Sequence, residues 1–217
     1  MARKKQQEIE LYEEVPEEYK SLKVFNRWPI QGIVVNDPGL RPYITLFPRI
    51  MPKTGAKYAG KRFYKSKISI VERLINKLMV PGHKGKKHFR TSGHCTGKAS
   101  HAYKVVKRAF EIIEEKLKQN PIEVLVRAIE NAATREEVVT IEYGGARYPK
   151  AVECAPQRRV DIALRMFVFG AYNRSFDKPK KIAEALAEEI IEAYNSSPRS
   201  VAIAKKIELE KQAQASR

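Results

Sequence analysis

The spacing of apolar residues is the feature that most constrains the fold of this chain. After residue 70 the apolar residues recur with a helical period in several segments, and in one segment they alternate instead. In the first periodic segment the apolar residues follow i, i+3, i+4, i+7 and i+8, the pattern of one buried helix face: Val71, Leu74, Ile75, Leu78 and Met79. The same kind of stripe recurs in residues 105–117 and 122–129 and after Pro156, Pro179 and Pro198. We therefore predict a mainly α protein with about six helices.

Three short motifs predict where helices begin. Ser69, followed three residues later by Glu72, fits a capping box, in which each side chain bonds the backbone N–H of the other residue. Asn120-Pro121 places a favoured N-cap residue before a proline, whose missing N–H is harmless in the first helical turn. Ser197-Pro198 predicts the same arrangement for the last helix, with Ser197 as its N-cap.

The break in the helical period predicts a β-hairpin at about residues 137–154. Val139, Ile141 and Tyr143 alternate with their neighbours, and a second alternating run follows the Gly144-Gly145 turn. An isolated hairpin is marginally stable in water. We therefore expect it to pack on the helices or to be held by a partner.

The first third of the chain lacks a regular period. Residues 1–20 are polar and rich in glutamate, and prolines and glycines interrupt residues 22–65 at short intervals. We expect an irregular, partly flexible N-terminal extension over residues 1–65 and a helical body over residues 66–217.

The net charge of the chain lies in one internal segment. Residues 41–108 contain 18 Lys and Arg residues and a single acid, Glu72, so this segment carries +17, the formal charge of the whole chain. Such a charge favours a polyanionic partner, with nucleic acid first and an anionic membrane surface second. No stretch has the 18 or so apolar residues of a spanning helix. Two cysteines cannot build a disulfide framework, so we expect a cytoplasmic protein.

The candidate RNA-binding cations fall into groups. One group lies among aromatic residues, which suits phosphate contact with base stacking, although those aromatics could equally be core residues; a second lies in a glycine-rich loop. A third opens a helix, where the macrodipole disfavours cations and a phosphate would be bound. The candidates are, in order, Arg49, Lys61, Arg62 and Lys65; Lys84, Lys86, Lys87 and Arg90; and Arg158 and Arg159.

Enzymatic interpretations have little support in the sequence. His83, His88, His94 and His101 share one segment with Cys95, which raises the alternative of a metal-dependent nuclease. Their spacing does not match the usual paired zinc modules, so we expect no metal site, no cofactor and no catalytic residue. A DNA-packing protein is the other alternative, because charge alone does not distinguish duplex DNA from structured RNA.

Several motifs together resemble small-subunit ribosomal protein seven, and specifically its archaeal and eukaryotic branch, over about residues 22–217. The similarity is in Ile70–Met79, Asn120–Ile122 with Ala128–Asn131, Gly144–Tyr148, and Arg158–Val160 with the helix that continues to Ala171. The branch is indicated by Tyr58–Phe63, by Asn195–Arg199 with Ala202–Lys206, and by the long region before Lys65. The order of these motifs is that of the family, and the resemblance identifies the chain as an archaeal member.

The resemblance implies a function as well as a fold. It implies a helical bundle with a protruding hairpin, and a non-enzymatic, cytoplasmic constituent of the small ribosomal subunit that binds the 3′ major domain of its RNA. It also implies nucleation of head assembly, proximity of the hairpin to exit-site tRNA and the mRNA path, and neighbours that include the ninth and eleventh small-subunit proteins. By matching position, Arg147, Lys150, Arg158 and Arg159 carry the hairpin and helix-start contacts, and Gly144, Gly145 and Arg147 form the tip.

Overall fold

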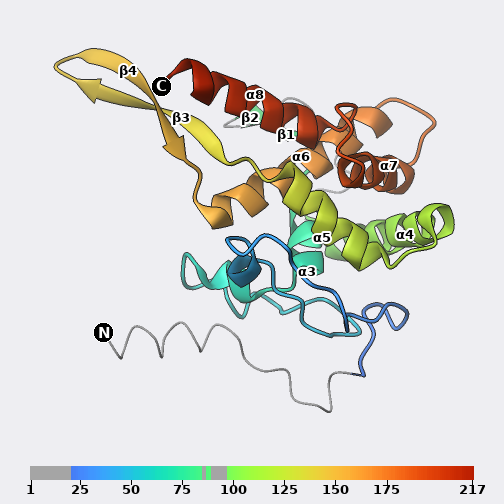
Figure 1. The fold of residues 1–217 in the computed structure, drawn as a ribbon. Helices are drawn as coiled ribbons and strands as arrows, with labels where there is room; N and C mark the ends of the chain where they lie inside the picture. Colours follow the sequence, from blue (N-terminus) through green and yellow to red (C-terminus); the bar gives the residue numbers. More distant parts are fainter. Residues whose placement is uncertain (1–20, 85–86, 89–96) are drawn as a thin grey trace, which may run out of the picture.

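The computed structural model describes residues 21–84, 87–88 and 97–217, and it confirms a mainly α fold with one long hairpin (Figure 1). The described helices are α3 (Ile70–Leu78), α4 (Ala99–Leu117), α5 (Pro121–Ala132), α6 (Pro156–Ser175), α7 (Ile182–Tyr194) and α8 (Val201–Ala215). The hairpin consists of β3 (Glu136–Tyr143) and β4 (Ala146–Glu153). Shorter elements are the 3₁₀ turns η1 (Arg41–Tyr43) and η2 (Tyr64–Lys67) and the paired two-residue strands β1 (His83–Lys84) and β2 (Lys87–His88).

The helix packing centres on α7, which contacts α4, α5 and α6. Its alanines and leucine are buried, as are the largest apolar side chains of the helices around it. Small residues on α7 allow its neighbours to approach closely, so the apolar stripes seen in the sequence close into one continuous core. No helix in the described part of the chain has both the length and the apolar character needed to cross a bilayer.

The start of α5 is confirmed in detail. The Oδ1 atom of Asn120 accepts a hydrogen bond from the backbone N–H of Ile122 at 3.0 Å, and Pro121 occupies the first turn. The Nδ2 atom of Asn120 also donates to the carbonyl of Pro29 at 2.7 Å. Asn120 therefore caps the start of α5 and also fixes the N-terminal region to the helical body.

Two predicted caps are wrong, the first because a tertiary contact takes the Glu72 side chain and the second because α8 begins three residues later than expected. Ser69 does precede α3, but it makes no side-chain cap, and Glu72 instead accepts bonds from the N–H and hydroxyl of Thr54 at 2.8 and 2.7 Å. The N-cap of α8 is Ser200, not Ser197. Its hydroxyl accepts from the backbone N–H of Ala202 at 3.2 Å and donates to buried Glu189 at 2.7 Å, which orients it.

Part of the N-terminal region belongs to the core. Phe25 and Trp28 pack edge-on against Phe110 of α4, with ring centroids 6.0 and 5.7 Å away. Leu40 and Ile44 are buried in the same cluster. The division of the chain at residue 65 stays a prediction, and residues 1–20 lie outside the described part of the structure. The buried apolar residues between 24 and 44 nevertheless share one core with the helices.

The hairpin is anchored at its base and exposed at its tip (Figure 1). Its strands pair in register from Glu136 with Glu153 to Tyr143 with Ala146, and α8 packs against both strands near the base. At the turn, Gly144 and Gly145 have φ values of +58° and +80°, which favour glycine at both positions and match the twist of the strands. The prediction of one β-hairpin at about 137–154 is confirmed.

Candidate nucleic-acid interface

Residues 47–67 form a basic-aromatic segment in which cations lie over aromatic rings. Cation-to-centroid distances run from 4.9 to 5.5 Å, within the range of an attractive cation–π contact. The pairs are Arg49 with Phe47, Lys57 with Tyr58, Lys61 and Lys67 with Tyr64, and Arg62 with Phe63. These cations therefore lie against neutral rings and form no ion pair with a carboxylate among the described residues.

The aromatic residues of this part of the chain divide between the two roles that the sequence left open. Tyr43 packs against the core. Phe63 is 61% exposed and carries the Arg62 guanidinium over its ring. Exposed rings paired with arginine are suitable surfaces for stacking of unpaired bases. Core packing therefore accounts for Tyr43, and Phe63 remains available for a ligand.

A cluster of four cations and one acid lies between α3 and α6. Asp161 on α6 accepts a hydrogen bond from Lys65 and pairs with Arg73 of α3 at 3.2 Å, and Arg73 also donates to the carbonyl of Tyr43 at 2.7 Å. Burial alone would raise the pKa of Asp161, but the bond from Lys65 and the charges of Arg73, Lys65 and Lys77 outweigh it and lower that pKa. Asp161 therefore stays ionised and neutralises part of the cluster.

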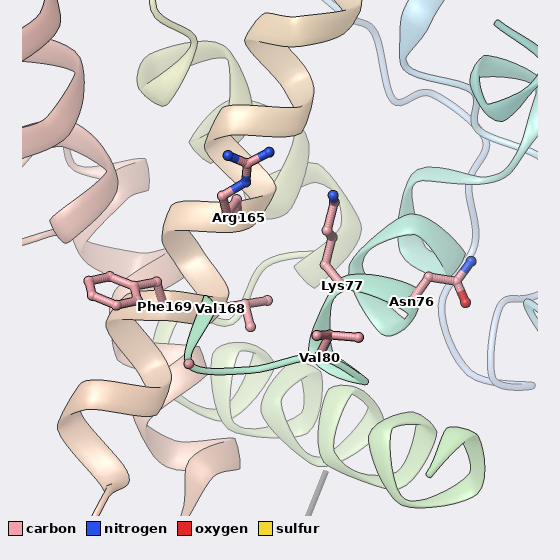
Figure 2. Close-up of a pocket in the computed structure, with 7 residues that line it drawn as sticks. Asn76, Lys77, Val80, Arg165, Val168 and Phe169 are labelled. Carbon is pink, nitrogen blue, oxygen red and sulfur yellow. The ribbon is translucent and has the colours of Figure 1, made fainter. Parts of the chain in front are cut away.

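The other two cations of the cluster are Lys77 on α3 and Arg165 on α6 (Figure 2). They line a cavity of about 300 Å³ together with Asn76, Val80, Gly82, Val168 and Phe169. Burial, followed by repulsion from Arg165, Lys65 and Arg73, lowers the pKa of Lys77 despite the attraction of Asp161. A partly buried cation among like charges indicates a site suited to an anion.

Arg158 and Arg159, at the start of α6, point to different partners in the structure. The Nε atom of Arg158 donates to both carboxylate oxygens of Glu137 in β3, at 2.6 and 2.8 Å. Arg159 pairs with Asp37 at 2.8 Å, and its side chain is only 13% exposed. Both arginines thus hold parts of the chain together: Arg158 fixes the hairpin base and Arg159 the N-terminal region. Their predicted joint contact with a phosphate stays a proposal.

The hairpin tip presents its polar groups to solvent. Arg147 makes one contact at 3.5 Å with Glu142 across the strands, and its side chain is 74% exposed. Lys150 is exposed opposite Val139. On the same face, Tyr143 and Tyr148 are 81% and 57% exposed. The outer part of the hairpin therefore offers two basic and two aromatic groups beyond the helical body.

Comparison with known proteins identifies the family. The family model described as ribosomal protein S7p/S5e matches residues 41–217. The chain belongs to the ribosomal protein S7p/S5e family. A relative named small ribosomal subunit protein uS7, from Nanoarchaeum equitans (strain Kin4-M), is 58% identical over 196 residues, which cover 90% of this chain and 99% of the relative. The resemblance to ribosomal protein seven of the archaeal type is thus confirmed, and S7p/S5e proteins are structural components of the ribosome and not enzymes.

The histidine-bearing loop is only partly described. Lys84 and Lys87 lie in β1 and β2, whereas Lys86, Arg90, His94 and Cys95 lie outside the described residues. Within residues 21–84, 87–88 and 97–217, no three His, Cys, Asp or Glu side chains gather as metal ligands would. The absence of a metal from this loop in an S7p/S5e protein stays a prediction.

The second cysteine, Cys154, follows β4 and is buried. Burial, with a smaller contribution from Glu137, raises the pKa of its thiol to about 11. A thiol with such a pKa stays protonated at neutral pH and is a poor nucleophile or metal ligand. Cys154 is therefore a packing residue at the hairpin base.

Lys77 and Arg165 were missed in the sequence, although a signal for them exists. Arg73 and Lys77 are spaced i, i+4 on α3, and Asp161 and Arg165 have the same spacing on α6, so each pair lies on one helix face. Neither spacing alone indicates that the two faces meet. The packing of α3 against α6 brings them together.

Proposed function

We propose that the chain binds the 3′ major domain of small-subunit ribosomal RNA and nucleates assembly of the subunit head. The observation that carries this proposal is the basic-aromatic segment, residues 47–67. Among the described residues, Lys65 is its one cation paired with a carboxylate, and the others face aromatic rings or solvent. Membership of the S7p/S5e family supports RNA as the polyanion.

The binding mechanism follows from the residue types. Each lysine or arginine that meets a phosphate releases condensed counterions, so affinity falls as salt rises. Sequence-independent contacts of this kind recognise RNA through its shape and through unpaired bases that stack on exposed rings. Arg49, Lys61 and Arg62 would supply phosphate contacts, and Phe63 a stacking surface.

The hairpin has a separate role in this proposal. Gly144, Gly145 and Arg147 at its tip would lie near exit-site tRNA and the mRNA path, with the ninth and eleventh small-subunit proteins as neighbours. Its length beyond the helical body and the exposure of Tyr143 and Tyr148 support a contact outside the body. Anchoring of its base by Arg158 and α8 would hold the tip in a defined direction.

A charge-matched pair of variants tests the proposal. Replacing Lys57, Lys61 and Arg62 together by Gln removes three unpaired cations. We expect the slope of log K against log salt for the 3′ major domain RNA to fall by about two, because each lost phosphate contact contributes about 0.7–0.9. The measurement is a salt titration of binding with a duplex DNA competitor.

The control variant replaces Arg108, Lys116 and Lys205 by Gln, which removes the same charge from cations that pair with Glu111, Glu188 and Glu208. We expect this variant to keep a slope close to that of the parent protein. Equal slopes in the two variants would mean that net charge alone governs binding. Stronger binding to duplex DNA than to the RNA domain would favour a DNA-packing protein instead.

A further inference from the structure

We propose that the cavity between α3 and α6 holds one backbone phosphate of the ribosomal RNA between Lys77 and Arg165, with the attached sugar against Val80 and Val168. The inference rests on the proposed RNA-binding function and assigns it a specific pocket. Figure 2 shows Lys77 and Arg165 extending from facing helices in the same general direction, with Val80 and Val168 between those helices.

The charge balance of the cluster calls for an anion. Asp161 is its one described carboxylate, and its two oxygens are taken by Lys65 and Arg73. Neither Lys77 nor Arg165 forms an ion pair with any described residue. Lys77 is attracted by Asp161 but is also repelled by Arg165 on the facing helix, and a phosphate between the two cations would replace that repulsion by attraction.

The environment of Lys77 supports the same conclusion. Its stem lies in the packed face of α3, and burial and neighbouring cations lower the pKa of its ammonium group. The attraction of Asp161 offsets only part of this effect, so the charged form of Lys77 is disfavoured in the protein alone. Such an arrangement is typical of a group whose partner arrives from outside the chain.

The shape of the cavity restricts the ligand. A volume of about 300 Å³ lies at the lower end of the range of small-molecule pockets, roughly 300–1,000 Å³. The walls combine the two cations with the apolar groups of Val80 and Val168 (Figure 2). Phosphate oxygens fit the two cations, and the carbon face of a ribose fits the two valines. A sugar-phosphate unit therefore suits the site better than a bare ion.

Two methionine variants test the assignment, Lys77→Met and Arg165→Met, with Lys211→Met on the exposed face of α8 as the control. Methionine keeps the apolar stem and removes the charge. We expect each pocket variant to bind the 3′ major domain RNA about tenfold more weakly, with a salt slope lower by about one. Lys77→Met should be as stable as the parent protein or more stable. The control, Lys211→Met, should have the RNA affinity and the free energy of unfolding of the parent protein.

The outcomes separate this proposal from the wider function. If the parent protein binds the RNA with a steep salt dependence and both pocket variants bind equally well, the pocket assignment is wrong and the function stands. If the parent protein fails to bind the RNA, the proposed function itself is wrong. Weaker binding by Lys77→Met accompanied by lower stability would assign Lys77 a structural role and overturn the pocket.

A spectroscopic titration identifies the ligand directly. With lysine side chains labelled for NMR, RNA binding should raise the pKa of Lys77, because an adjacent phosphate favours the charged ammonium form. The probes are inorganic phosphate, uridine monophosphate and a short single-stranded RNA. A rise that grows from the first probe to the last supports a sugar-phosphate site. An equal response to inorganic phosphate and RNA, or no response to any probe, would contradict it.

Discussion

The basic-aromatic segment and the C-terminal helices use cations in opposite ways. In residues 47–67 the lysines and arginines lie mainly over aromatic rings, and among the described residues only Lys65 pairs with an acid. In the C-terminal helices, Arg174 of α6 contacts three acids of α7, with Glu189 at 3.1 Å and Glu188 at 3.9 Å, and it also pairs with Glu192. The difference teaches that the nearby acids, and not the cation itself, decide whether a charge stabilises the fold or remains available to a ligand.

The cluster between α3 and α6 combines both uses. Asp161 commits Lys65 and Arg73 to the fold and leaves Lys77 and Arg165 unpaired. A single carboxylate thus separates structural cations from available ones. Replacing Asp161 is therefore the most direct test of whether nearby acids decide the role of a cation.

The largest effect is expected from Asp161→Asn. Arg73 is 5% exposed, and loss of its charged partner leaves a buried guanidinium without a counter-ion. We expect the free energy of unfolding to fall by about 3 kcal/mol, measured by urea denaturation. The control, Glu115→Gln, removes a 60% exposed partner of Arg108 and should change stability by less than about 0.5 kcal/mol. Equal losses in the two variants would contradict the structural role of Asp161.

An acid titration of the parent protein and of Asp161→Asn checks the sign of the contribution of the Asp161 charge to stability. The pKa of Asp161 in the folded protein is lowered below its ordinary value of 3.8. The folded state therefore binds fewer protons at this group, and its stabilising contribution is present above that value and is lost as pH falls below it. The parent protein should lose this contribution on acidification, and the stability difference from Asp161→Asn should narrow.

Gly170→Ala should give the next largest effect. A Cβ at this position would lie 2.7 Å from the Cδ and Oε2 atoms of Glu189, whose carboxylate is fully buried and bonded to Ser200 and Arg174. We expect a loss of about 2 kcal/mol in thermal or urea unfolding, because that bonded group must shift. Gly60→Ala in the basic-aromatic segment meets no atom within 4 Å and should be nearly neutral. An unchanged free energy of unfolding in Gly170→Ala would show that Glu189 can move to make room for the methyl group.

The smallest effect is expected from Arg147→Gln at the hairpin tip. Arg147 and its partner Glu142 are 74% and 62% exposed and 3.5 Å apart, so water screens their attraction. We expect the free energy of unfolding to change by less than about 0.5 kcal/mol. A larger loss, measured alongside Asp161→Asn, would mean that the tip contributes to the fold, in contrast to its exposure.

The sequence predicted the elements whose signals are local. The helical stripes, the Asn120-Pro121 start of α5 and the Gly144-Gly145 turn depend on neighbours within a few residues, and each is found where expected. The cap of α3 was predicted wrongly because Glu72 bonds to Thr54, 18 residues away, and the start of α8 was misplaced because Ser200, which also bonds buried Glu189, is its cap. A local motif cannot show that a more distant partner competes for the same side chain.

The candidate site was predictable only in part, for a related reason. Charge density located the basic-aromatic segment, since its cations are neighbours in sequence. The partners of Arg158 and Arg159 are Glu137 and Asp37, and the second lies 122 residues from its arginine. Lys77 and Arg165 likewise meet only because α3 packs on α6. Pairing across such separations depends on which helices pack together, and the spacing of residues along one helix does not show this.

The anchoring of the hairpin has a consequence for the order in which the chain matures. The backbone N–H of Arg135, just before β3, donates to Glu210 of α8 at 3.0 Å, across 75 residues of sequence. Because synthesis proceeds from the N-terminus, both strands are made before the helix that fixes their direction. Closing so long a loop carries an entropic cost that local strand pairing avoids. Arg158 of α6 holds the hairpin base from one side, and α8, the last helix to be made, supplies the remaining contacts. The anchoring of the hairpin is therefore complete only once the C-terminal helix is in place.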